Sequence, residues 1–509
     1  MRPILPAHTF LSALVLTPFL TGCWMVGPNY KRPQAIISPI FKEAPNPPPG
    51  WTVAQPEMAE VDKGPWWRIY GDPTLDGLED QVNITNQNLK QYEAQYRKAR
   101  AMIDSVRAQL FPTLNGNFSF SRNAQGGQSR SASAGSFVNY SHTTTVNTWS
   151  TSPSASWTID IWGKIRRQVE QQVDLTQASA ADLANARLSY QAQLATNYFN
   201  MRYQDSLRRL YARNVSYFRE ALRIVQNQAE AGVAEPSALL QARYQLQQTI
   251  AQETQAGVAR AQYEHAIAVL MGKAPAEVTI PEADLPPGLP AVPAAVPSTL
   301  LQRRPDIASA ERKLAGFNAA IGAAIAAYYP QFTLSAQYGY SGDPLDELIR
   351  AASRFWSLGA AASETIFSGG ARRAAVRSAK ADYDAAVANY RQTVLTALQN
   401  VEDNFSNLRI LEQQYGEQEA AVASAKEAVR VSMNAFMAGT EIYTTVITSQ
   451  QNALNYEVQA LGVRQSQWTS HVALITALGG GWDAASLPKR QSLTSNNPFI
   501  DGYFRKAKE

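Results

Sequence analysis

Two stretches of the chain carry apolar residues at alternating spacings of three and four positions. This 3.5-residue period predicts helices packed as left-handed coiled coils. Two proline-free stretches, 164–229 and 371–437, predict far longer helices, each about 100 Å at 1.5 Å per residue. A soluble coiled-coil rod is the alternative interpretation. The two stripes are Leu89, Tyr92, Tyr96, Ala99, Ile103, Val106 and Leu110, and Ile307, Ala310, Leu314, Phe317, Ile321, Ala324 and Tyr328.

Four shorter segments alternate between apolar and polar residues with a period of two. Their length, about ten residues, is that of a tilted membrane strand, and an apolar face opposite a hydroxyl-rich face is typical of outer-membrane barrels. A half-buried sheet is the alternative, but its exposed face would usually carry lysine and glutamate. We expect 123–147 and 342–353 to be outward-facing loops, and Glu364 interrupts the last apolar face. The segments are 113–121, 149–161, 331–341 and 356–367.

Four strands are too few to close a membrane barrel. Open edges would leave backbone groups unpaired in lipid, at several kcal/mol each, so the barrel must be shared between chains. Two chains would give eight strands, whose interior is filled by side chains, and three would give twelve, which leave a pore. The polar inner face favours three chains.

The same order of elements occurs twice: helix, strand, strand, long helix, helix. Residues 111–114 (FPTL) resemble 329–332 (YPQF) at an offset of 218, whereas Arg166 matches Arg372 at an offset of 206. We therefore expect the first copy to carry 12 more residues between its strands, with a one-residue shift near Gly232. A fixed internal period of this kind indicates a repeated structural unit.

The N-terminus resembles a lipoprotein signal. Arg2 precedes a short apolar run, 10–20, which is too short to span a bilayer, and the run ends in Leu-Thr-Gly before Cys23, the chain's one cysteine. Acyl chains on that cysteine would anchor the protein, and Trp24, in place of aspartate, favours the outer membrane. The alternative is an ordinary signal peptide with an incidental cysteine.

Composition and charge exclude several function classes. The 509 residues are 45% hydrophobic and 17% charged, with a mild net charge of +4 that is scattered along the chain, so nothing indicates nucleic-acid binding. A single cysteine excludes an internal disulfide. There is no Gly-x-Ser-x-Gly elbow, phosphate-binding loop or metal-spaced histidine pair, so we expect neither an enzyme nor a cofactor beyond the acyl chains. The histidines are His8, His142, His265 and His471.

Five motifs in order resemble the outer-membrane factor family, the TolC-like channels of efflux and type I secretion. More narrowly, they resemble its lipoprotein branch, which serves resistance-nodulation-division pumps. Together they span nearly the whole mature chain, although each is weak alone. The motifs are Cys23 with 26–33 (VGPNYKRP), 66–73 (WWRIYGDP), 159–164 (IDIWGK), 301–307 (LQRRPDI) and 477–482 (ALGGGW).

The resemblance implies a mainly α-helical homotrimer with a 12-stranded β-barrel in the outer membrane and a long α-helical barrel in the periplasm. Drugs or other small toxic compounds would pass to it from an inner-membrane pump and a periplasmic adaptor, the membrane fusion protein. A type I protein secretion duct and a coiled-coil lipoprotein without a pore are the rivals. The implied divisions are the signal peptide (1–22), a lipid-anchored equatorial segment (23–74), repeat 1 (75–272), a proline-rich equatorial linker (273–297), repeat 2 (298–480), and a C-terminal equatorial segment with a tail that we expect to be disordered from Pro488 (481–509).

In the family, the periplasmic mouth lies at the helix turns that correspond here to Gly232 and Gly439, and rings of aspartate narrow it. None of the matching positions here is acidic, which predicts a constriction of hydroxyl and apolar groups with weak cation selectivity. The alternative is that Glu441 supplies the ring. Val233 and Ile442, beside the two glycines, are the expected adaptor contacts. The matching mouth positions are Thr444, Thr445, Thr448, Ser237, Ala238 and Gln241.

Local signals predict how helices begin. Proline at 305 ends a short helix, and Asp306 can accept N–H bonds at the start of the next one. Asn88 is expected to do the same in the first copy. Gly163 and the Ser-Gly-Gly of 368–370 predict strand-to-helix turns.

Overall fold

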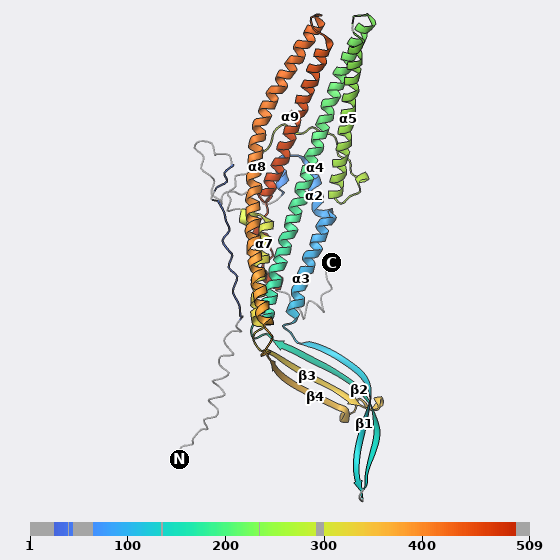
Figure 1. Ribbon diagram of the computed structural model, residues 1–509, viewed down its shortest axis with the longest axis vertical. Helices are drawn as coiled ribbons and strands as arrows, with labels where there is room; N and C mark the ends of the chain where they lie inside the picture. The colour runs from blue at the N-terminus through green and yellow to red at the C-terminus, as the bar shows by residue number, and fades with distance from the viewer. Residues whose placement is uncertain are drawn as a thin grey trace.

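The computed structural model describes residues 25–38, 40–43, 65–133, 136–233, 235–291 and 300–494. The strands lie at one end of an elongated molecule, and the longest helices run from them to the opposite end (Figure 1). The elements of the first copy are α2 (Pro73–Thr85), α3 (Gln87–Ala108), β1 (Thr113–Ser133), β2 (Ser136–Ile159), α4 (Lys164–Glu230) and α5 (Pro236–Leu270). Those of the second are α6 (Leu300–Arg303), α7 (Pro305–Ala326), β3 (Gln331–Gly342), β4 (Arg354–Ser363), α8 (Ala371–Met437) and α9 (Tyr443–Ala477).

The predicted order of helix, strand, strand, long helix and helix is therefore confirmed in both copies. Corresponding helices have equal lengths: 22 residues for α3 and α7, 67 for α4 and α8, and 35 for α5 and α9. The bounds are offset by 218 before the strands and by 207 from α4 onward. The sequence-based offset of 206 and the shift near Gly232 are thus wrong, because the paired arginines were aligned one position out of register. The first copy carries 11 extra residues, not 12.

The four strands form one antiparallel sheet in the order β1-β2-β3-β4 (Figure 1). The predicted loop 123–147 is wrong for most of its length, since β1 and β2 remain paired out to Ser133 and Ser136. Hydroxyl-rich sequence continues the ladder there because backbone pairing alone satisfies the polar groups. In the loop 342–353, two short 3-10 helices, Leu345–Glu347 and Ala351–Ser353, occur.

β4 is shorter than predicted. Its last residue, Ser363, pairs with Gln331, the first residue of β3. Beyond that point, the described part of the chain offers no strand for pairing, and Ile366 and Phe367 are exposed. The predicted strand to residue 367 is therefore wrong within a single chain, for want of a partner.

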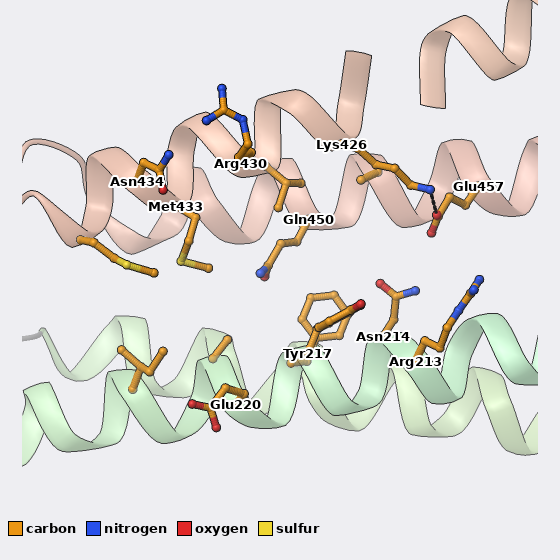
Figure 2. A pocket seen from close by; sticks show the side chains of 16 residues that line it. Arg213, Asn214, Tyr217, Glu220, Lys426, Arg430, Met433, Asn434, Gln450 and Glu457 are labelled. Carbon is orange, nitrogen blue, oxygen red and sulfur yellow. Dashed lines mark ion pairs between the residues drawn. The ribbon is translucent and has the colours of Figure 1, made fainter. Parts of the chain in front are cut away.

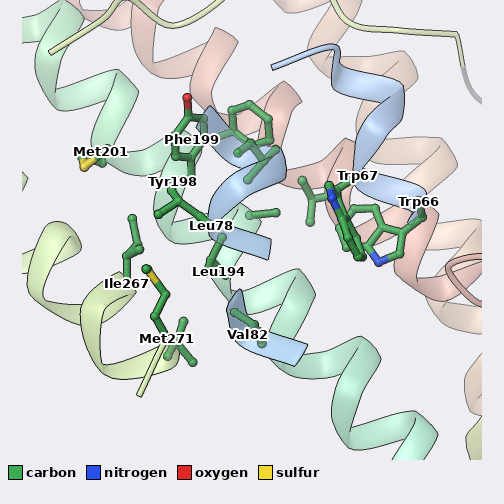
Figure 3. Close-up of a cluster of buried hydrophobic side chains, with 14 of the residues drawn as sticks. Trp66, Trp67, Leu78, Val82, Leu194, Tyr198, Phe199, Met201, Ile267 and Met271 are labelled. Carbon is green, nitrogen blue, oxygen red and sulfur yellow. The ribbon is translucent and has the colours of Figure 1, made fainter. Parts of the chain in front are cut away.

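The largest apolar core lies where the segment before the first copy meets the long helices (Figure 3). A 3-10 helix, η2 (Trp66–Tyr70), and α2 pack against α4, α5 and α9. Phe199 of α4 packs against Trp468 of α9 in a tilted arrangement with ring centroids 4.4 Å apart, and Tyr70 lies against both rings. This core joins the two copies to the N-terminal segment.

Two further segments are held to the helices by charged side chains. Asp205, wholly buried on α4, accepts from Arg202 and Arg260 and from the backbone N–H of Ala283 in the linker.

After Pro488, α10 (Arg490–Thr494) packs near the start of α4. The prediction of disorder from Pro488 is therefore wrong as far as Thr494.

α10 is held in place by two ion pairs and one buried apolar side chain, which is why this segment is ordered. Arg490 pairs with Asp174 at 3.1 Å and with Glu170 at 3.3 Å, while Leu493 is buried against Ile103 and Val173. The polar composition of this segment concealed these contacts. The rest of the predicted tail, 495–509, lies outside the described residues.

The helix starts mostly follow the predicted capping. Asp306 accepts the N–H of Ile307 and pairs with Arg304 at 2.6 Å. In the first copy, however, Asn86 and not Asn88 is the cap: its side chain accepts from the N–H of Leu89. An N-cap lies outside the helix and bonds the third residue inward, so the cap was placed two residues too late.

Two glycines make the predicted strand-to-helix turns. Gly163 and Gly370 precede α4 and α8 with left-handed φ angles of 79° and 86°. This conformation is accessible to glycine at little cost and strained for other residues. Within the described part of the chain, no helix has both the length and the apolar character needed to cross a membrane.

Candidate functional site

The sheet has one apolar face and one face of small polar side chains. Leu114 on β1 and Leu358 on β4 are 77% and 75% exposed, so the apolar face is uncovered in the single chain. On the other face, Ser119 and Ser150 share a 2.7 Å hydrogen bond, and Gln337 donates to Ser152 at 3.1 Å. Such a sheet separates lipid from water.

Both outer strands of the sheet have an unpaired edge. β1 and β4 each hydrogen-bond to one neighbour in the chain, and their apolar side chains are more exposed than those of the inner strands. Leu334 of β3, for example, is 39% exposed. A sheet of this kind in lipid needs further strands to satisfy its edges.

The segment after Cys23 is clamped at the base of the sheet. Val26 donates to the carbonyl of Trp162 at 3.1 Å. The buried guanidinium of Arg167 donates to the carbonyls of Val26 and Gly27 and to Asn29. Cys23 itself lies outside the described residues, but this clamp holds the chain at the strand-to-helix junction from Val26, three residues after Cys23.

At the far end of the helices, two turns repeat the same geometry. Gly232 and Gly439 both have φ of 73°, and a Cβ atom there would meet nothing within 4 Å. Val233 donates to Gln228, and Thr440 to Ala435, which closes each helix with a six-residue turn. Both glycines are thus required by conformation.

The predicted adaptor contacts lie on these turns. Val233 is 77% exposed and Ile442 is 68% exposed. Both apolar side chains project from the tips without cover from this chain. That exposure suits a partner surface.

Several predicted mouth residues come together where α5 meets α9. Thr444 donates to Gln241 at 3.2 Å, a contact between residues 203 positions apart. Thr448 donates to the carbonyl of Thr444 at 2.9 Å, and Ser237 donates to Glu235 at 3.0 Å. The structure therefore joins Thr444 to Gln241 directly. Thr448 and Ser237 form hydrogen bonds only to residues at the start of their own helices.

Ala238 has a different environment. It packs against the apolar cluster beneath the turns, which contains Tyr443, Val446 and Ile447. Burial raises the pKa of Tyr443 to about 12, so its hydroxyl stays neutral. Ala238 therefore supports the tip through packing.

The carboxylate of Glu441 turns back on its own helix. One of its oxygens accepts from the backbone N–H of Ile442 at 3.1 Å and from the hydroxyl of Thr445 at 2.9 Å. These bonds tie the carboxylate to the start of α9 but cap no backbone N–H of the helix. One oxygen of Glu441 and one of Glu235 are thus engaged locally. The direct contact between α5 and α9 at this level is made by the hydroxyl of Thr444 and the amide of Gln241.

Sequence reasoning missed a second polar contact one to two turns farther along. Gln245 of α5 is buried, is hydrogen-bonded to Gln451 of α9, and lies beside the buried Thr249. The signal was present: glutamine and threonine occupy core positions of α5, and buried polar groups require partners.

A groove of about 780 Å³ lies below the tips, between α4 and the α8–α9 pair (Figure 2). Tyr217 and Met433 line it from opposite sides, and Lys426 of α8 pairs with Glu457 of α9 at 2.6 Å. The groove combines apolar surface with charges of both signs. Among the described residues, no group of histidine, cysteine and acidic side chains could hold a metal ion.

Known proteins resemble this chain in sequence and in fold. The model of a family described as "Outer membrane efflux protein" matches residues 78–273 and 296–480, one segment in each copy. The antibiotic efflux pump outer membrane protein ArpC and the toluene efflux pump outer membrane protein TtgC, both of Pseudomonas putida, are each 28% identical over 477 residues, which is 93% of this chain and 96% of theirs. The solved structure of the outer-membrane channel OprN superimposes with a TM-score of 0.79 at 28% identity, over 90% of this chain and 99% of that chain.

Proposed function

The chain belongs to the outer membrane efflux protein family, and from this premise we propose that three copies close into one continuous duct from the periplasm to the outside. The protein is an outer-membrane efflux component with a TolC-like fold. The observation that carries the trimer is the open-edged, four-stranded sheet with one apolar and one hydroxyl-lined face. Three such sheets make twelve strands, enough for a water-filled lumen.

The oligomer and its conductance test this proposal together. In detergent, native mass spectrometry is expected to give the mass of three chains. The same sample, added to a planar lipid bilayer, is expected to give stepwise ion currents. A stable single chain that passes no current would overturn the duct.

Acylation of Cys23 would fix each chain at the inner surface of the outer membrane. The clamp of Arg167 on residues 26–29 supports this, because it holds the segment after Cys23 at the base of the sheet. Each buried CH₂ group of an acyl chain contributes about 0.8 kcal/mol. Intact-mass measurement is expected to show a mature chain that begins at Cys23 and carries diacylglycerol and an N-acyl chain. A free thiol at Cys23 would contradict it.

The constriction at the helix tips is formed by hydroxyl and amide groups. The contact of Thr444 with Gln241 and the local bonds of Glu441 support this assignment. We expect weak cation selectivity, and we expect Thr448→Ala to alter single-channel conductance more than Glu441→Gln. If Glu441→Gln changes ion selectivity while Thr448→Ala leaves conductance unchanged, a glutamate ring forms the constriction.

The partners are a periplasmic adaptor and an inner-membrane pump of the resistance-nodulation-division type. The exposed Val233 and Ile442 on the tip turns, with Gly232 and Gly439, provide the adaptor surface, and the groove below them adds apolar area. The names of the Pseudomonas relatives favour small drugs or solvents over secreted proteins as cargo. Val233→Glu or Ile442→Glu should abolish cross-linking to the adaptor while the trimer persists. Unchanged cross-linking would remove the tips from the interface.

A further inference from the structure

Each hairpin of the sheet carries a pair of aromatic residues toward its outer end, the end away from the helices (Figure 1). Adding 218 to a residue of β1 gives its counterpart in β3, and adding 207 to a residue of β2 gives its counterpart in β4. The observed pair of Phe120 with Trp149 becomes Tyr338 with Trp356, which is also an observed pair. The two hairpins therefore hold aromatic residues at the same position of their ladders.

The next pair outward on the same face contains one arginine in each hairpin. In the first copy Arg122 lies opposite Asn147, and in the second copy Tyr340 lies opposite Arg354. These two pairs are again counterparts, but the arginine comes from the first strand of one hairpin and from the second strand of the other. The cation, and not the strand that carries it, is what the two hairpins share.

Both arginines lie on the apolar face, because positions two residues apart on a strand share a face. The ring centroids of Phe120 and Trp149 on this face are 4.4 Å apart. From Trp149 to Ile159 the apolar side of β2 advances ten residues. That is about 33 Å of strand, or about 25 Å of height at a tilt of about 40°, which equals the apolar band of outer-membrane barrels. The arginines therefore lie just beyond the band, at the level of lipid head groups.

The strands carry fixed charges of one sign. They contain Arg122, Arg130 and Arg354, and neither lysine, aspartate nor glutamate. The side chains of Arg122 and Arg354 are exposed, and among the described residues no hydrogen bond or ion pair engages either of them. By contrast, Arg350 in the outer loop pairs with Glu347 at 2.8 Å. Arg122 and Arg354 are therefore cations for which the described chain supplies no anion.

We infer that Arg122 and Arg354 bind the phosphate groups of lipids in the outer leaflet, one lipid at each arginine. A guanidinium can donate two parallel N–H bonds to the oxygens of one phosphate. The aromatic pair beneath each arginine lies where the acyl chains begin, a level at which such rings are enriched in membrane proteins. The inference rests on the proposed membrane barrel and assigns its lipid ligands.

Lipid retention measured by native mass spectrometry of the detergent-purified protein tests these sites. The two probes are bisphosphorylated lipid A and the same lipid with both phosphates removed, which share their acyl chains. The wild-type protein should retain the first probe and little of the second. Arg122→Asn and Arg354→Asn should each lose half of the retained lipid, and the double variant nearly all. Arg350→Asn, the matched control at the same end of the molecule, should retain the wild-type amount.

Transfer of the arginine across its pair provides a rescue. Arg122→Asn combined with Asn147→Arg places the cation on the second strand, as in the second copy. This variant should regain the lipid that Arg122→Asn loses. A role of Arg122 in folding alone gives no reason for such a recovery.

The outcomes separate the lipid sites from the duct. Equal retention of the two probes, full retention by the double variant, or failure of the transferred arginine to restore binding overturns the lipid sites. The double variant should remain a conducting trimer, because neither arginine faces the lumen, and a conducting trimer with any of these three results leaves the duct intact. A single chain that passes no current overturns the membrane barrel and the lipid sites with it.

Discussion

The two long helices, α4 and α8, have the same length and the same place in their copies, yet their burial differs. α4 has buried side chains along most of its length, from Ile165 to Val225. α8 is exposed over most of its surface. Its buried residues are Tyr390, Val394, Ala397, Val401, Phe405 and Ser432.

The difference comes from neighbours rather than from local sequence. Among the described residues, α4 packs on α3, α5, α7 and α9, whereas α8 packs on α7 and α9 and, at Phe405, on Phe41 of the N-terminal segment. The pattern of apolar residues determines that each helix forms, and its place in the assembly determines what covers it. In the proposed trimer, a neighbouring chain would cover both the exposed side of α8 and the open edge of β4.

Loss of the clamp at the start of α4 should have the largest effect. Arg167 is buried and pairs with Glu170 at 2.7 Å while holding residues 26–29. Its removal takes this buried donor from two backbone carbonyls and Asn29 and leaves Glu170 with Arg490 alone, so Arg167→Ala should cost about 3–5 kcal/mol. Thermal unfolding followed by circular dichroism measures the loss. The control is Arg373→Ala, at an exposed arginine in the first turn of α8, where we expect a change within about 0.5 kcal/mol; equal losses would contradict the asymmetry.

Acid should lower the free energy of unfolding through His471, which bonds the proline-rich linker to α9 in the second copy. His471 of α9 and Glu264 of α5 occupy equivalent positions, and both hold the linker: Glu264 accepts from the N–H of Ile280, and His471 donates through Nε2 to the carbonyl of Pro290. Nδ1 of His471 then accepts from Tyr70 at 3.0 Å. Burial lowers the pKa of His471 to about 4.

The lowered pKa of His471 makes the folded state less stable as the pH falls. As the pH falls below about 6.5, the unfolded chain takes up a proton on His471 that the folded chain refuses, so stability declines until about pH 4. The total decline from this group is about 3 kcal/mol. His471→Gln, which retains a donor and an acceptor, should flatten the fall in denaturant midpoint between pH 6.5 and 4. An unchanged acid slope in this variant would contradict the assignment.

Substitution of the glycine in either tip turn should reduce stability by the same amount, and by less than the changes above. Gly232→Ala and Gly439→Ala each place a Cβ on a left-handed residue with open space around it, which costs about 1 kcal/mol from the backbone alone. Chemical denaturation of each variant measures this. A large loss at one turn alone would show that its Cβ meets a neighbouring chain.

The periods of 3.5 and 2 were sufficient to predict α3, α7 and the four strands, and the absence of proline over more than 60 residues was sufficient to predict α4 and α8. These signals could not predict the extension of β1 to Ser133, since a hydroxyl-rich hairpin tip has no apolar face to mark it. The docking of Arg490 on Asp174 and the contact of Thr444 with Gln241 depend on groups brought together by the fold. The end of β4 at Ser363 could not be predicted either, because it is set by where its partner strand β3 begins.

The central claim is that the hydroxyl-lined face of the sheet lines water and the opposite face contacts lipid. The direct measurement is single-channel current during modification by a charged, water-soluble thiol reagent. Ser119→Cys, on the polar face, should react and lower the conductance. Phe120→Cys, the next residue on the apolar face, should leave the current unchanged. A blocked current with Phe120→Cys and none with Ser119→Cys would contradict the duct.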